Sequence, residues 1–252
     1  MIDWNYINSK KVTNKPWNDS KYNALYCVGG VMEICRRFRP KTHRELFDRY
    51  IETGNEFSKL LKTRAKETQE IFSCPAKIRE KAQKNQVYGD FFKESRNYGR
   101  DKEFITKLAE EFADECHLDL EEAKKQVYDR LFIETFNGFQ NEKLVIEEFN
   151  KRFHQWFIVE EADSSKDAKY AIDLVIKNAK TGLEIGAIQV KPISYLLRND
   201  EVMQITKGLN ERKNTLYGRP VYYVFYNNHE QPGKTKIEME EGLKQMLLEM
   251  SI

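Results

Sequence analysis

The sequence predicts a mixed α/β protein in which a mainly helical N-terminal region precedes a core built around a mixed sheet. Two observations lead to this prediction. Apolar residues recur at three- and four-residue spacing through much of residues 22–130, which is typical of amphipathic helices. After Gly138 the pattern changes to short apolar runs of strand character between helical segments.

Local signals place several helix boundaries in the N-terminal region. Thr42 is the expected N-cap of a helix that runs through Tyr50 and ends at Gly54. Asp101 and Asp119 mark later helix starts, because a carboxylate there accepts backbone N–H groups at the positive end of the helix. These signals describe architecture and carry no function.

The C-terminal part has the order α-β-β-β-α-β, followed by a last helix. The domain boundary is therefore expected between residues 1–134 and 135–252. A turn at residues 178–182, with Gly182 at a positive-φ position, would join the second and third strands as a hairpin. The seven elements are expected at about residues 139–153, 156–159, 170–176, 185–190, 199–214, 220–226 and 237–250.

Composition excludes several classes of protein. No run approaches the roughly 18 apolar residues of a membrane span, and the first twenty residues lack the apolar region of a signal peptide. We therefore expect a cytoplasmic protein without membrane contact. The four cysteines include no CxxC pair, which favours reduced thiols over disulfides or a zinc site.

Three polar residues stand in otherwise apolar strands of the predicted core. Asp173 lies within the run YAIDLVI, where an ionised carboxylate costs on the order of several kcal/mol unless a charged or hydrogen-bonding group meets it. Gln189 follows sixteen residues later, and strand geometry puts it on the same face as Lys191. A hairpin between the two strands would bring the three side chains together.

A carboxylate, a second oxygen ligand and a lysine on adjacent strands suit the hydrolysis of a phosphodiester. The oxygens can hold Mg²⁺, which polarises the phosphate and lowers the pKa of a bound water. The lysine can orient that water or stabilise the developing charge. Two structural alternatives stay open: Asp173 and Lys191 could form an ion pair without catalysis, and Gln189 could cap a turn.

Three short motifs surround these residues: TFNG at 135–138 with Glu142 in the helix that follows, YAID at 170–173, and AIQVKPISY at 187–195. With them, residues 135–226 resemble the PD-(D/E)xK nuclease superfamily, and within it type II restriction endonucleases of the MjaI kind. The resemblance implies a restriction-endonuclease-like fold, Mg²⁺ as cofactor, and a homodimer that cuts double-stranded DNA at a short palindrome.

Two positions depart from the superfamily pattern. Ile172 stands where the motif name has Pro, and Gln189 stands where Asp or Glu is usual. A neutral amide binds Mg²⁺ less strongly than a carboxylate does, so the resemblance implies a second carboxylate from elsewhere. Glu142 is the expected residue. The alternatives are Glu147, Glu161 and Asp163.

A basic segment precedes the core. Residues 58–100 contain more Lys and Arg than Asp and Glu, and residues 88–100 mix aromatic with basic side chains. This mixture suits phosphate contacts with stacking at base steps, so Lys93, Arg96 and Arg100 are expected to contact DNA. The aromatic residues could instead belong to the protein core.

Two further functions remain compatible with the same core. One is a structure-specific or repair nuclease. The other is a DNA-binding protein without catalytic activity, for which the neutral Gln189 leaves room.

Overall fold

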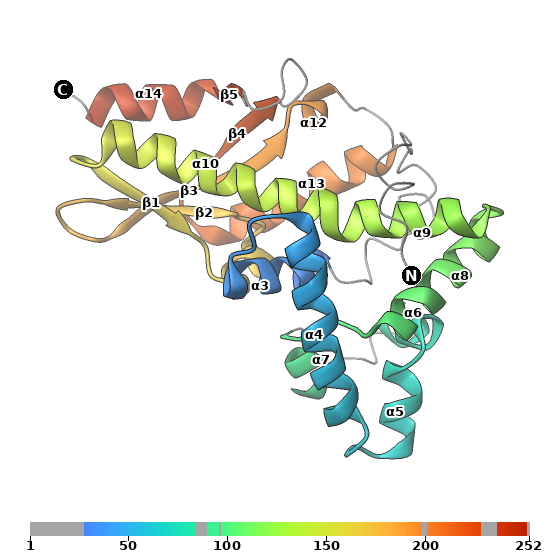
Figure 1. The fold of residues 1–252 in the computed structure, drawn as a ribbon. Coiled ribbons are helices and arrows are strands. Elements are labelled where there is room, and N and C mark those ends of the chain that lie inside the picture. The colour runs from blue at the N-terminus through green and yellow to red at the C-terminus, as the bar shows by residue number, and fades with distance from the viewer. Residues whose placement is uncertain (1–27, 84–89, 96, 198–200, 228–235, 251–252) are drawn as a thin grey trace. The chain divides into compact units, whose positions relative to one another are not determined.

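The computed structural model shows two compact units, Met1–Asn137 and Gly138–Ile252 (Figure 1). The division falls within helix α10 (Thr135–Phe153). The residues described are 28–83, 90–95, 97–197, 201–227 and 236–250.

The described part of the first unit is helical. Aromatic rings pack together in its core, with ring centroids 5.0 Å apart for Phe47 and Phe132 and 5.2 Å apart for Tyr50 and Phe132. Its elements are α3 (Val28–Phe38), α4 (His43–Leu61), α5 (Lys66–Phe72), α6 (Pro75–Gln83), α7 (Asp90–Ser95), α8 (Lys102–Cys116), α9 (Leu120–Tyr128) and the π-helix η2 (Asp129–Glu134).

The three predicted N-caps are confirmed. The hydroxyl of Thr42 accepts from the Glu45 N–H at 3.1 Å. The carboxylate of Asp101 accepts from the Phe104 N–H at 2.9 Å, and that of Asp119 caps α9 in the same way. Each such cap contributes about 1 kcal/mol to helix stability.

The predicted helix end at Gly54 is wrong, because α4 continues to Leu61. Gly54 is buried, and a Cβ atom on it would lie 2.1 Å from the carbonyl carbon of Arg100. The glycine therefore permits a close approach between the helix and the segment around Arg100. A helix with a glycine in its interior is tolerated when packing requires it.

The second unit contains a five-stranded sheet in the order β1-β2-β3-β4-β5. The β3–β4 pair is parallel and the other pairs are antiparallel, so the predicted mixed sheet is confirmed. The strands are β1 (Phe157–Glu161), β2 (Leu174–Asn178), β3 (Glu184–Pro192), β4 (Val221–Asn227) and β5 (Lys236–Met239). The helices of this unit besides α10 are α11 (Ser164–Tyr170), α12 (Ser194–Leu197), α13 (Glu201–Tyr217) and α14 (Glu241–Met250).

Helices cover both faces of the sheet. On the first, which we call the α10 face, Val145 of α10 and Leu243 of α14 pack against Leu174, Ile188 and Val224 of the strands. On the second, the α13 face, the buried cluster consists of Ala162, Ile172, Val175, Ala187 and Tyr217. Within the described residues, none of the helices is both long and apolar enough for a membrane crossing.

The β2–β3 hairpin is confirmed, but the strand predicted at residues 170–176 is partly wrong. Residues before Ala171 form α11, whose N-cap Asp163 accepts from the Lys166 N–H at 2.9 Å. Ala171 ends the helix in the left-handed region, with φ of 54°. Asp173 consequently lies directly before β2 and not in the middle of a strand.

The helix predicted from residue 237 is also partly wrong. Lys236–Met239 form strand β5, which pairs with β4, and the helix begins at Glu241. The backbone of β4 offers an open edge to this segment, and pairing with that edge decides its conformation.

Asn150 of α10 covers the outer edge of the sheet at β1. Its side-chain Nδ2 donates to the Val159 carbonyl, and its Oδ1 accepts from the Val159 N–H, both at 2.8 Å. The amide therefore takes the place of a neighbouring strand for one residue of β1, which blunts an otherwise open edge.

Replacing Asn150 with alanine is expected to lower the free energy of unfolding by about 2 kcal/mol, because two hydrogen bonds of about 1 kcal/mol each are lost. Urea denaturation of the full chain measures the change. Lys151→Ala, at the adjacent exposed position, is the control and should shift the free energy by less than about 0.5 kcal/mol. Equal denaturation midpoints for Asn150→Ala and wild type would contradict the edge-covering role.

Candidate active site

Asp173 is held from several sides where β2 begins. Its N–H donates to the Ile188 carbonyl and its carbonyl accepts from the Ala162 N–H, both at 3.0 Å. Its side-chain Oδ2 accepts from the Val190 N–H at 2.7 Å and from Nζ of Lys191 at 3.2 Å. One charged and one backbone donor thus compensate a carboxylate whose residue is only 9% exposed.

Gln189 and Lys191 alternate with apolar residues along β3, as predicted. Ile188 and Val190 belong to the cluster on the α10 face, so Gln189 and Lys191 lie on the α13 face with Ala187. Gln189 is 2% exposed, and its Oε1 atom has no hydrogen-bond partner within the described part of the chain. A buried acceptor of this kind costs about 1–3 kcal/mol and is suited to a cation or a donor group.

Glu142 is buried on the side of α10 that faces the sheet. Glu142 lies three residues before Val145, so both residues are on the same side of the helix, and Val145 packs in the cluster on the α10 face of the sheet. The charge of Glu142 acts on Lys191 and contributes to raising the pKa of that lysine. The structure therefore places Glu142 in the electrostatic surroundings of Lys191, together with Asp173.

Lys191 is held in its protonated form. Burial by itself lowers the pKa of Lys191, but the charge and hydrogen bond of Asp173, with smaller effects of Glu142 and Asp167, raise it above the ordinary lysine value. At neutral pH the side chain is therefore an ammonium group and a hydrogen-bond donor. The ion pair of Lys191 with Asp173 stabilises the folded protein fully below the ordinary lysine pKa. This stabilisation is lost as pH rises through the raised pKa of Lys191.

The alternative carboxylates differ in their surroundings. Glu147 is exposed on α10. The carboxylate of Asp163 caps α11 by accepting a hydrogen bond from the Lys166 N–H. A hydrogen bond from Ser165, together with the Lys166 N–H, lowers the pKa of Asp163. Glu161 ends β1 opposite Leu174.

Asp167 is a residue near the site that sequence reasoning missed. It lies in α11, a helix that was not predicted, and its charge raises the pKa of Lys191. The sequence did contain a signal for the start of this helix, because Asp163 is a residue type that commonly caps helices and stands just before a short polar segment.

Arg100 does not fit the predicted contact with DNA. It is 7% exposed, its Nη1 donates to the Gly99 carbonyl at 2.8 Å and to the Ser95 carbonyl at 3.2 Å, and its guanidinium lies 4.4 Å from the ring centroid of Phe57. Phe91 and Tyr98 also contact Phe57, which favours the alternative that the aromatic residues belong to the core. The side chains of Lys93 and Arg96 lie outside the described residues.

The donor atoms of the site fit Mg²⁺. Asp173 and Gln189 offer oxygen ligands, and Glu142 offers another from α10 on the opposite face of the sheet. Mg²⁺ prefers oxygen ligands, whereas zinc sites are rich in nitrogen and sulfur. The buried Oε1 of Gln189 is the observation that most favours a cation here. Across the described residues, no group of three or more His, Cys, Asp and Glu side chains is placed to hold a metal ion. The set proposed here has two carboxylates and one amide.

Replacing Asp173 with asparagine is expected to lower the pKa of Lys191. The substitution removes the negative charge of Asp173, which is the largest cause that raises the Lys191 pKa, while burial continues to lower it. An NMR titration of ¹³C-labelled lysine side chains measures this pKa. Glu160→Gln, which changes the partner of Lys177 instead, should leave it unaltered. An unchanged Lys191 pKa in Asp173→Asn would disprove the electrostatic coupling.

One comparison with known proteins found a match. The model of the MjaI restriction endonuclease family matches residues 10–239, a range that reaches into both units and includes Glu142, Asp173, Gln189 and Lys191. Neither the curated proteins nor the solved structures gave a match. Because the family model extends over most of the sequence, the chain belongs to the MjaI restriction endonuclease family.

Proposed function

We propose that the protein is a type II restriction endonuclease, which cuts both strands of DNA at a short palindromic sequence with Mg²⁺ as cofactor. Membership of the family supports a nuclease hydrolase. The observation that carries the proposal is the carboxylate of Asp173, held 3.2 Å from the ammonium of Lys191 and next to β3, which also bears Gln189.

Asp173, Gln189 and Glu142 would hold Mg²⁺. When bound, the ion polarises the scissile phosphate and makes a bound water more acidic. The Val190 N–H bonds only Oδ2 of Asp173 in the contacts described above, so the other carboxylate oxygen of this residue is the natural ligand atom. The buried amide oxygen of Gln189 would supply the neighbouring ligand.

Lys191 would act as a donor and not as a general base, because its raised pKa keeps it protonated. Its ammonium would orient the attacking water and stabilise the negative charge that develops on the phosphate. Water attacks phosphorus, the bond from phosphorus to the 3′ oxygen breaks, and that oxygen takes up a proton. The products are a 5′-phosphate and a 3′-hydroxyl.

A two-fold symmetric homodimer is the economical arrangement for cutting both strands of a palindrome, because each subunit then acts on one strand. The helical first unit is proposed to contribute DNA contacts and dimer surface. Lys93 and Arg96 remain candidates for phosphate contacts. Arg100 does not, because the protein itself surrounds its guanidinium.

One observation favours a second candidate function. The neutral Gln189 is a weaker Mg²⁺ ligand than a carboxylate, so a DNA-binding protein without catalysis is the alternative. A structure-specific nuclease on the same core would differ in its substrate, and the experiment below separates all three.

Incubation of plasmid DNA with the protein and Mg²⁺ is expected to give discrete fragments. Lys191→Ala should reduce the cleavage rate at least about 100-fold, because a charge-stabilising donor is lost, with DNA binding retained. Lys180→Ala, in the exposed β2–β3 turn, is the control and should cut at the wild-type rate. Preference for branched DNA would identify a structure-specific nuclease, and binding without cleavage at any Mg²⁺ concentration would leave the non-catalytic alternative.

The Mg²⁺ dependence tests the ligand assignment. Glu142→Gln is expected to raise the half-saturating Mg²⁺ concentration by at least about tenfold, which corresponds to about 1.4 kcal/mol of binding free energy. Gln189→Glu should lower it, because a carboxylate binds Mg²⁺ more strongly. Glu147→Gln, at an exposed position of the same helix, is the control. A larger shift for Glu147→Gln than for Glu142→Gln would overturn the assignment.

A further inference from the structure

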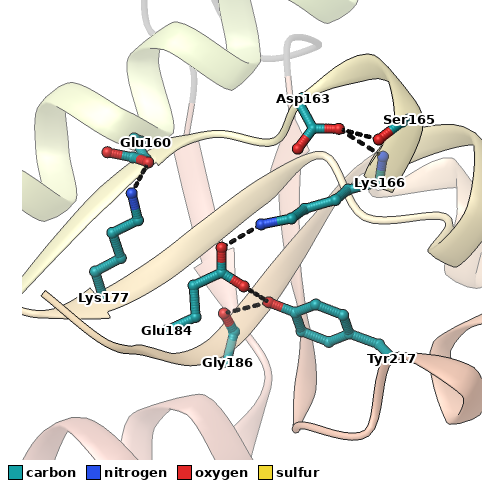
Figure 2. Close-up of polar contacts among 8 residues, drawn as sticks. All are labelled: Glu160, Asp163, Ser165, Lys166, Lys177, Glu184, Gly186 and Tyr217. Atoms are coloured by element: carbon teal, nitrogen blue, oxygen red, sulfur yellow. Dashed lines mark hydrogen bonds and ion pairs between the residues drawn. The ribbon is translucent and has the colours of Figure 1, made fainter.

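One carboxylate joins three elements on the α13 face of the second unit (Figure 2). Glu184, the first residue of β3, forms an ion pair with Lys166 of α11 and accepts a hydrogen bond from the Tyr217 hydroxyl at 3.1 Å. The same hydroxyl lies 3.5 Å from the Gly186 carbonyl. Tyr217 is the last residue of α13, so the network connects α11, β3 and α13.

A β-bulge directs Glu184 to this face. Ile176 pairs with Gly186 but Lys177 pairs with Glu184, so Ile185 is an extra residue in β3. Ile185 packs against the cluster of the α10 face, and the strand alternation changes phase there. If β3 were a regular strand with Ile185 paired to Lys177, Glu184 would lie two residues before Gly186 and point towards the apolar cluster of the α10 face.

The protonation states suit this network at neutral pH. Burial is the main cause that raises the pKa of Tyr217 to about 12, so its hydroxyl remains a donor. The hydrogen bond from Lys166 is the main cause that lowers the pKa of Glu184, so its carboxylate remains an acceptor. The carboxylate is also sheltered, with 19% of its side chain exposed.

The position of α11 depends on these contacts. A helix of seven residues is too short to be stable by itself. Lys166 and Tyr170 are four residues apart and therefore lie on one side of α11. Lys166 contacts Glu184, and the ring of Tyr170 lies 5.4 Å from that of Tyr217. Both contacts of α11 are therefore made with the hydrogen-bonded pair Glu184 and Tyr217.

The end of α11 leads directly into the candidate active site. Ala171 closes the helix with its N–H bonded to the Asp167 carbonyl at 2.9 Å. Ile172 is fully buried in the cluster that also contains Tyr217, and Asp173 is the next residue. A displacement of α11 would therefore pass to Asp173 through a short, tightly packed connection.

We propose that Lys166, Glu184 and Tyr217 are positioning residues of the nuclease site. They fix α11 against β3 and α13, and the carboxylate of Asp173 thereby stays in place to bind the Val190 N–H, Lys191 and the metal ion. The inference rests on the proposed nuclease function. Displacements of about 1 Å at a reacting centre are enough to slow a reaction about 100-fold.

The chain contains a matched control. Glu160 and Lys177 form another Lys–Glu ion pair, which joins β1 and β2 and includes no residue of α11 (Figure 2). Glu160→Gln therefore removes an ion pair of the same chemistry without loosening α11.

The test compares Glu184→Gln and Tyr217→Phe with wild type and with Glu160→Gln. Both network variants are expected to lower kcat for DNA cleavage about 10- to 100-fold, the usual effect of losing a residue that orients a ligand, with KM for DNA within about twofold of wild type. Lys166→Arg, which keeps the positive charge, should restore most of the rate that Lys166→Met loses. Without DNA or metal, hydrogen exchange of residues 164–174 should be faster in both network variants and unchanged in Glu160→Gln.

Several outcomes would overturn the inference. Wild-type kcat in both network variants, a loss no larger than that of Glu160→Gln, or wild-type exchange in residues 164–174 would each show that these side chains do not position Asp173. If the wild-type chain cuts no DNA with Mg²⁺, the proposed function fails, and the nuclease role of the network fails with it. The two failures are thus distinguishable by the wild-type digest alone.

Discussion

The requirement to bury a charged carboxylate at Asp173 governs the arrangement of the second unit. The charge is tolerated because the Val190 N–H and the Lys191 ammonium both reach the same oxygen. This geometry demands that β2 and β3 lie antiparallel in one fixed register, since a shift of one residue would turn Lys191 to the opposite face. The hairpin, the strand alternation and the packing of α10 all satisfy that demand.

The same contact bears on two interpretations that the sequence left open for Asp173 and Lys191. A structural ion pair and a catalytic pair are usually treated as competing interpretations of an aspartate and a lysine in a core. Here Asp173 keeps Lys191 protonated, and a protonated lysine is the form that stabilises charge on a phosphate. In the proposed mechanism, the ion pair that compensates the buried charge of Asp173 also keeps Lys191 in the form that the reaction needs, so the two interpretations are compatible.

The sequence was informative where structure is decided locally. The N-caps at Asp101 and Asp119, the β2–β3 turn and the shared face of Gln189 and Lys191 all follow from signals within a few residues. Family membership was accessible for the same reason, because the motifs around Asp173 are short and contiguous.

Features that depend on distant partners could not be predicted. Helix α11 is too short for a periodic signal, and contacts with Glu184 and Tyr217 hold it. Gly54 resembles a helix end until the backbone of Arg100 is seen beside it. A basic residue in a basic segment suggests phosphate binding, yet Arg100 is covered by Phe57, which lies far away in the sequence.

The extra residue in β3 sets Glu184 in the opposite phase from the rest of the strand. Glu184, the one residue of β3 before Ile185, contacts Lys166 of α11, whereas Gln189 and Lys191, after Gly186, belong to the proposed active site. Regular pairing of Lys177 with Ile185, without the bulge, would turn Glu184 towards the apolar layer of the α10 face while leaving Gln189 and Lys191 in register with β4. A change of strand pairing at this one point would thus alter the support of α11 without exchanging any residue of the proposed site.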